Sequence, residues 1–153
     1  MADPAVTHTL TTPGGTIVFN DGSDDQFYIT DIPDLDDPPI RNPKDAVPFG
    51  DGGLIYQSFT GPWEVPVEGH FLILSTQNQQ AIQSIRNDME ADLRAALRSI
   101  RAPTSGTWAW TPLGEAARSL DVYYDVKLRC PHDQNFLLRA FQFGIVTGDS
   151  DYS

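Results

Sequence analysis

Residues 76–101 stand out in this sequence because they have the spacing of one long amphipathic helix. Their apolar side chains recur at steps of three and four residues along one face: Ile82, Ile85, Met89, Leu93, Ala96, Leu97 and Ile100. Thr76 followed three residues later by Gln79 predicts a capped start, and Pro103 predicts the end. A single helix with one apolar stripe needs a sheet to cover, so the rest of the chain must supply strands.

The segments on both sides of this helix have strand patterns. Strands are predicted before it at 16–19, 27–30, 54–58 and 63–74, and after it at 106–111, 120–128 and 136–146. Residues 120–128 alternate strictly between apolar and polar, which predicts one buried and one wet face. Residues 136–146 are apolar on both faces, so this strand is expected to be central or to meet a partner. The fold class predicted is mainly β with one long helix.

The chain has 153 residues, which is the size of one domain. We expect an N-terminal arm over 1–14, a single domain over 15–146 and a polar tail over 147–153. Residues 33–53 contain five prolines and are predicted to form a long loop. Long ordered loops in compact domains are usually binding or contact elements.

Charge is distributed unevenly along the chain, whose formal net charge is −11. Residues 1–70 contain twelve acids and two bases, whereas residues 71–153 contain nine acids and eight bases. An acidic front half disfavours binding to a phosphate backbone, so no nucleic-acid partner is predicted. The acids serve either solubility or complementarity between one copy's acidic front and a neighbour's basic patch.

The sequence offers no pattern for catalysis or for a cofactor. Cys130 is the single cysteine, and the three histidines do not have metal-ligand spacing. A hydrolase using Glu64, Glu68 or Cys130 is the least favoured alternative, because no nucleophile signature accompanies them. No catalytic residue, cofactor or metal is therefore predicted. The absence of a signal peptide and of a long apolar run predicts a soluble product of the cytoplasm with no membrane partner.

The three tryptophans, Trp63, Trp108 and Trp110, leave one alternative open. Exposed together, they would form a stacking platform for sugars, as in a carbohydrate-binding β-sandwich module. Packed inward or at an interface, they would serve as core or anchor residues, which is the reading we favour.

Several short motifs occur in an order that resembles the N-terminal region of distal tail proteins from long-tailed, siphovirus-type bacteriophages. They are Arg41, Asp51-Gly52, Glu68-Gly69, Leu93-Arg94-Ala95-Ala96-Leu97 and Gly106-Thr107-Trp108-Ala109-Trp110. The order matches over about residues 12–146. Trp63 departs from the pattern, since an Arg is common at that position. Many members of the family also carry a second, C-terminal domain.

The resemblance implies a β-sandwich, tail-tube-like domain with a helix packed alongside, and no catalysis. It further implies a virion protein, assembled in the host cytoplasm into a hexameric ring. That ring would connect the tail tube to the tail tip or baseplate. A tail-tube or tail-completion protein remains the alternative within the same class. Contacts between subunits are expected in loop 33–53 and the last hairpin, and the candidate interface residues are Arg41, Asp51, Trp63, Glu68, Arg94, Arg98, Phe141 and Phe143.

Overall fold

The structure, a computed structural model, describes residues 6–35, 63–131 and 139–147 in full. Between residues 36 and 62 it describes the backbone of four short strands only. The predicted class is confirmed, because the described chain is mostly strand with one helix, α1 (Gln79–Arg98). Seven strands form the main sheet: β1 (His8–Thr12), β2 (Gly15–Phe19), β3 (Asp25–Asp31), β8 (Trp63–Ile73), β9 (Gly106–Trp110), β10 (Arg118–Arg129) and β11 (Arg139–Thr147).

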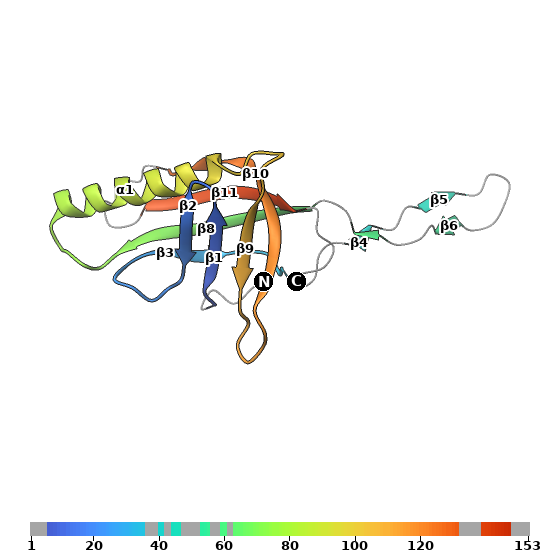
Figure 1. Ribbon diagram of the computed structural model, residues 1–153, viewed down its shortest axis with the longest axis horizontal. Coiled ribbons are helices and arrows are strands. Elements are labelled where there is room, and N and C mark those ends of the chain that lie inside the picture. The colour runs from blue at the N-terminus through green and yellow to red at the C-terminus, as the bar shows by residue number, and fades with distance from the viewer. Residues whose placement is uncertain are drawn as a thin grey trace.

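These strands close into a barrel in the order β1-β2-β3-β8-β11-β10-β9, so the expected sandwich is corrected to a closed barrel. In Figure 1, β1, β2 and β9 run across the direction of β8 and β11. Strand β10 joins the two directions. Its first half, Arg118–Val122, pairs with β9, and its second half pairs with β11 through two register shifts. Such irregularities bend a strand, which lets one sheet curl around and close.

The irregular half of β10 also corrects the predicted alternation. Leu120, Val122 and Leu128 are buried as expected, but Val126 is 50% exposed. The register shifts lie on both sides of Val126. The Leu128 N–H donates to the Tyr124 hydroxyl, a side-chain acceptor on its own strand. The bulge thus rotates Val126 outward, where its side chain covers Gly144 of β11.

Residues 8–12, close to the N-terminus, are a strand of the barrel. Residues 1–14 were expected to be an arm, yet β1 pairs with β2 on one side and with β9 on the other. Side chains alternate between the two faces of β1, and those of His8 and Leu10 face inward and are completely buried. The Pro13-Gly14 turn brings the Gly14 N–H to the Ser99 hydroxyl at the end of α1, 3.1 Å away.

The barrel closes between β2 and β3 through a single parallel pair, Phe19 with Phe27. Asn20 extends this seam with its side chain, since Oδ1 accepts from the Ile29 N–H at 2.8 Å. Its Nδ2 donates to the Val6 carbonyl at 3.3 Å. Asn20 has φ 58°, a left-handed conformation that asparagine tolerates better than most residues. One side chain therefore supplies hydrogen bonds that a longer strand would make with its backbone.

Helix α1 begins later than the expected 76–101 and ends earlier. Asn78 is the N-cap, and its Oδ1 accepts from the backbone N–H groups of Gln80 and Ala81. Thr76 lies outside the helix and accepts from the Asn78 N–H. Leu93, Ala96 and Leu97 are buried as the spacing predicts, and Figure 1 shows α1 crossing the ends of β1 and β2.

The interior of the barrel is filled by aromatic rings. The ring centroids of Phe19 and Trp108, which stack, are 5.1 Å apart, and those of Phe71 and Phe141 are 5.2 Å apart. Gly69 makes this packing possible, because a Cβ there would lie 2.2 Å from the Tyr28 carbonyl oxygen and 2.5 Å from the Phe141 ring. Gly69 is therefore a site of close approach on β8.

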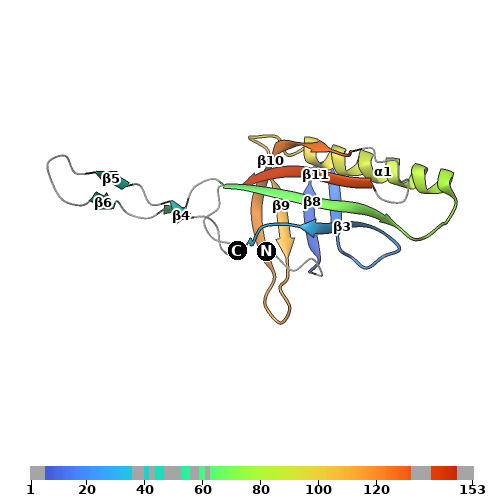
Figure 2. The same ribbon diagram turned by 180° about the vertical axis from the view of Figure 1, so that it is seen from behind.

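The predicted loop 33–53 instead includes two short strands, β4 (Ile40–Arg41) and β5 (Lys44–Ala46), whose partner strands follow them in the chain. Two short antiparallel ladders form, β4 with β7 (Phe59–Thr60), and β5 with β6 (Gly53–Ile55). Three residue steps separate Arg41 from Lys44, and four separate Ile55 from Phe59, so the two ladders differ in register by one residue. Figures 1 and 2 show both ladders outside the barrel, beyond the end where β8 begins.

Candidate functional site

The structure separates the candidate interface residues into buried and accessible ones. Trp63, Phe141 and Phe143 are at most 6% exposed and belong to the core cluster. Their side chains pack inside the barrel and present no surface to a neighbour, which corrects their assignment as interface residues. They are buried because the register of the paired strands β8 and β11 places them on the inward faces.

The remaining candidates differ in what can be said of them. Glu68 is exposed on the outer face of β8, and Arg98 is exposed in the last turn of α1. Arg94 is partly covered. Arg41 lies in β4, where only the backbone is described, and Asp51 lies outside the described residues. The accessible, described candidates are therefore one acid and two bases, on different elements.

Glu68 is one of three carboxylates around a pocket of about 400 Å³. The pocket lies where β3 ends beside the first half of β8, and its lining residues are Asp31, Ile32, Pro33, Asp34, Pro66 and Glu68. Gln142 on β11 donates to Glu68 Oε1 at 3.4 Å. Carboxylates next to proline rings and an isoleucine make a surface suited to a basic side chain with an aliphatic stem.

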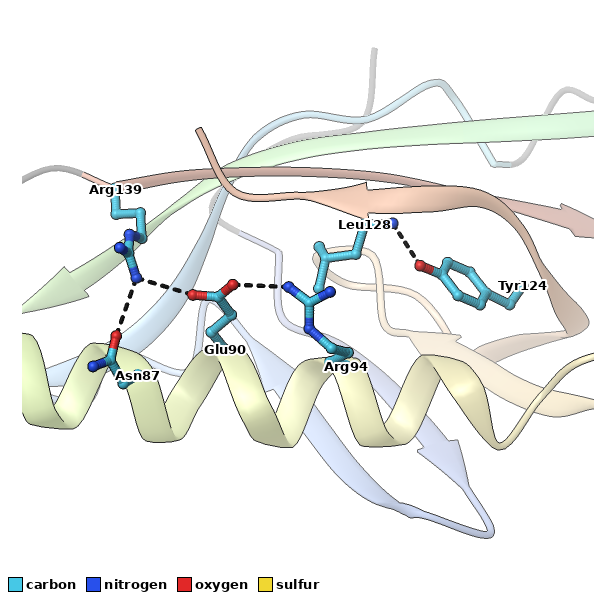
Figure 3. A network of polar contacts seen from close by, with 6 residues as sticks. All are labelled: Asn87, Glu90, Arg94, Tyr124, Leu128 and Arg139. Carbon is cyan, nitrogen blue, oxygen red and sulfur yellow. Dashed lines mark hydrogen bonds and ion pairs between the residues drawn. The ribbon is translucent and has the colours of Figure 1, made fainter. Parts of the chain in front are cut away.

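The arginines that could complement this acidic pocket lie mainly on α1. Arg94 donates to Glu90 Oε1 at 2.8 Å, and Arg139 at the start of β11 donates to Glu90 Oε2 at 2.9 Å (Figure 3). Arg139 also reaches Asn87 Oδ1 at 3.2 Å. Two guanidinium groups thus share one carboxylate, and Arg98 lies one turn beyond Arg94 on the same helix. The sequence did not reveal this network, because Glu90 and Arg139 are 49 positions apart.

Cys130 lies near this network, and its thiol is not activated as a nucleophile. Burial raises the pKa of its thiol to about 12, and the neighbouring Glu90 carboxylate acts in the same direction. A nucleophilic cysteine needs the opposite, a thiolate stabilised near neutral pH. The Cys130 thiol is therefore protonated at neutral pH, which removes the basis of the cysteine-hydrolase alternative.

A second surface covers the outer faces of β2, β1, β9 and β10. The strand registers place mostly small side chains there in two rows: Val18, Thr9, Ala109 and Ser119 in one, and Thr16, Thr11, Thr107 and Asp121 in the other. Asp121 is the charged residue of these eight. At one end lies a pocket of about 440 Å³ whose lining includes Thr9, Ala109 and Leu113, and Leu113 is 98% exposed. Such a neutral face suits protein contact better than substrate chemistry.

The sugar-platform alternative loses its main support. Trp63, Trp108 and Trp110 are 6%, 0% and 5% exposed, so they are core residues that offer no stacking face. Within the described ranges, no group of three or more His, Cys, Asp or Glu side chains is arranged to hold a metal ion. In that same part of the chain, no helix is both long enough and apolar enough to cross a bilayer.

Comparison with known proteins gives a likeness in fold. No protein-family model matches the sequence, and no curated protein sequence matches it. Among solved structures, the chain is similar to the Dit protein (gp 19.1) of phage SPP1, described as a paradigm of the hub adsorption apparatus in phages that infect Gram-positive bacteria. The TM-score is 0.58 with 14% sequence identity.

This match covers 93% of the present chain and 50% of the SPP1 protein, so the chain spans half the length of that relative. The resemblance to phage distal tail proteins is thus confirmed at the level of fold.

Proposed function

We propose that this protein is a structural subunit of a phage tail. Copies of it form a ring, of six subunits, that connects the tail tube to the tail tip or baseplate. It acts by assembly and carries out no chemical reaction. In the mature phage it is part of the virion, and its partners are further copies of itself, the tube protein and the tip or baseplate proteins.

The observation that carries this proposal is the fold shared with SPP1 Dit over 93% of the chain. The site chemistry supports it from another direction. The described surface presents an acidic pocket, two arginines on α1 and a neutral face, which are features of contact surfaces. The protonated Cys130 thiol weakens the hydrolase alternative, and the buried tryptophans weaken the carbohydrate-binding alternative.

The contacts within the ring join unlike surfaces. A closed ring is built from head-to-tail interfaces, in which one patch of a subunit meets a different patch of the next. The acidic pocket around Glu68 suits one side of this contact, and Arg94 with Arg98 suits the other. Arg41 and Asp51 belong to the segment that contains the two short ladders, which we assign to the same interface. Charge complementarity then aligns copies that would otherwise repel, since each carries −11.

A charge exchange tests this pairing. Glu68→Arg and Arg98→Glu each place like charges opposite each other, so either variant alone is expected to dissociate at physiological salt. In a ring that alternates the two variants every contact again joins opposite charges, so the mixture is expected to recover association. Sedimentation velocity measures both effects.

Glu64→Arg is the matched control for charge. Glu64 is exposed on the same face of the same strand but does not line the pocket. It should leave the oligomer largely intact. Equal dissociation by Glu64→Arg and Glu68→Arg would show that net charge, and not this pocket, governs association.

A further inference from the structure

His8 is an unusual residue for the interior of this barrel. Its side chain is completely buried, and its Nδ1 accepts a hydrogen bond from Trp108 Nε1 at 3.1 Å. Because Nδ1 is the acceptor, the neutral ring carries its proton on Nε2, and that atom is buried without a hydrogen-bond partner among the described residues. A buried, unpaired N–H costs free energy, so a residue of this kind calls for an explanation.

The surroundings of His8 contain little to stabilise a charge. It is the one ionisable residue of β1, β2 and β9. Its register partners are Phe19 on β2 and Trp110 on β9, and Trp108 packs against Phe143 of β11. The nearest charges in register come from β10, where Arg118 lies opposite Trp110 and pairs with Glu115. The end of helix α1 lies near the far end of β1 from His8, where the Ser99 hydroxyl accepts a hydrogen bond from the Gly14 N–H.

Protonation would change this arrangement in a defined way. An imidazolium donates from both nitrogens, so Nδ1 could no longer accept from Trp108, and two donors would face each other. The positive charge would also lie among aromatic rings with no carboxylate opposite it. Both penalties disappear if β1 leaves its place and His8 reaches water.

We propose that His8 is an acid-sensitive latch that holds β1 in the barrel and releases it when the imidazole gains a proton. Release leaves the facing edges of β2 and β9 without a partner strand, and such edges pair readily with strands of other chains. The latch would thereby couple acidification to a change in how copies associate. It concerns a conformational property of the barrel and does not depend on the proposed role in a phage tail.

The direction of the pH dependence follows from linkage. Burial lowers the pKa of His8 from 6.5 to about 4 in the folded barrel. The released state therefore binds more protons between these values, and the closed state loses stability as the pH falls from 6.5 towards 4. With these two pKa values, release becomes roughly 20-fold more favourable at pH 5 than at pH 7.

Amide hydrogen exchange of the intact chain, expressed as protection factors, tests the latch. We expect β1 amides to lose roughly 20-fold in protection between pH 7 and pH 5, while β8 and β11 lose much less. His8→Asn is the matched variant, since its amide oxygen offers Trp108 an acceptor and does not ionise. In this variant the selective loss in β1 should vanish. Equal losses in all strands, or the same selective loss in His8→Asn, would overturn the proposal.

A second measurement keeps the test decisive if His8→Asn does not fold. Titration of the wild-type imidazole by NMR should give a His8 midpoint near 4. A midpoint near the ordinary value of 6.5 would show that the folded barrel accepts the proton without cost, and the latch would not exist.

Discussion

Arg139 Nη1 lies 2.9 Å from Glu90 Oε2, which fastens the start of β11 to the middle of α1. The Arg139 side chain is 8% exposed and that of Glu90 is 18% exposed, so this ion pair is largely shielded from water. Arg94 holds the second oxygen of Glu90 from the same helix. The carboxylate therefore orients two guanidinium groups at once, one across the helix–barrel boundary.

Replacing Glu90 should destabilise the fold, because it leaves Arg139 buried without its carboxylate. We expect Glu90→Gln to lower the free energy of unfolding by about 1–3 kcal/mol, below the value for a fully buried pair because the group is partly hydrated. Urea denaturation measures this. The control is Glu115→Gln, which breaks the more exposed pair with Arg118 and should cost less than about 1 kcal/mol. Equal costs for both variants would mean that the Arg139 contact contributes nothing special.

Asn20 should be the most sensitive residue at the seam of the barrel. Asn20→Ala removes the acceptor for Ile29 N–H and the donor to Val6, and we expect a loss of about 2–3 kcal/mol. Asn20→Asp keeps the acceptor but turns a carboxylate oxygen towards the Val6 carbonyl at a buried site, so it should also lose stability. Thermal unfolding of the three proteins gives the ranking, and an alanine variant as stable as wild type would refute the role of this side chain.

The apolar face of α1 can be tested with two identical substitutions. Leu97 is completely buried under the helix, whereas Leu113 is 98% exposed on the β9–β10 connection. We expect Leu97→Ala to cost about 2–5 kcal/mol, and Leu113→Ala to stay within about 0.5 kcal/mol. Denaturant midpoints measure both. A large loss for Leu113→Ala would show that its side chain is covered in solution, as by a second copy on the neutral face.

The segment with the two short ladders should matter for assembly and not for the barrel. Deleting 38–48 removes one side of both ladders but none of the seven barrel strands. We expect the deleted protein to keep its unfolding midpoint and to lose association, as judged by circular dichroism and light scattering. An unchanged oligomer would remove this segment from the interface.

Much of this fold was predictable because local patterns determine it. The steps of three and four in α1 identified the buried Leu93, Ala96 and Leu97, and the alternation of 120–122 identified two core residues of β10. These signals depend only on the geometry of a helix or a strand. They hold wherever one face of an element meets the core.

What escaped prediction depends on contacts between distant residues. The sequence predicts an arm where β1 lies, because Thr9, Thr11 and Thr12 interrupt the apolar pattern, and the burial of this strand comes from β2 and β9. Barrel closure depends on the bulges of β10 and on Asn20, whose partners lie elsewhere in the chain. The sequence predicts Phe141 and Phe143 as interface residues, whereas the register with β8 places them on the inward face of β11.

The most direct test of the proposed ring is the native mass of the purified chain, combined with negative-stain images over a concentration series. We predict closed rings with a mass near six times 16.9 kDa that do not lengthen as concentration rises. Long stacks would favour the tail-tube alternative over a ring that ends the tube. A chain that stays monomeric at every concentration, also when mixed with its tube and tip partners, would contradict the proposal.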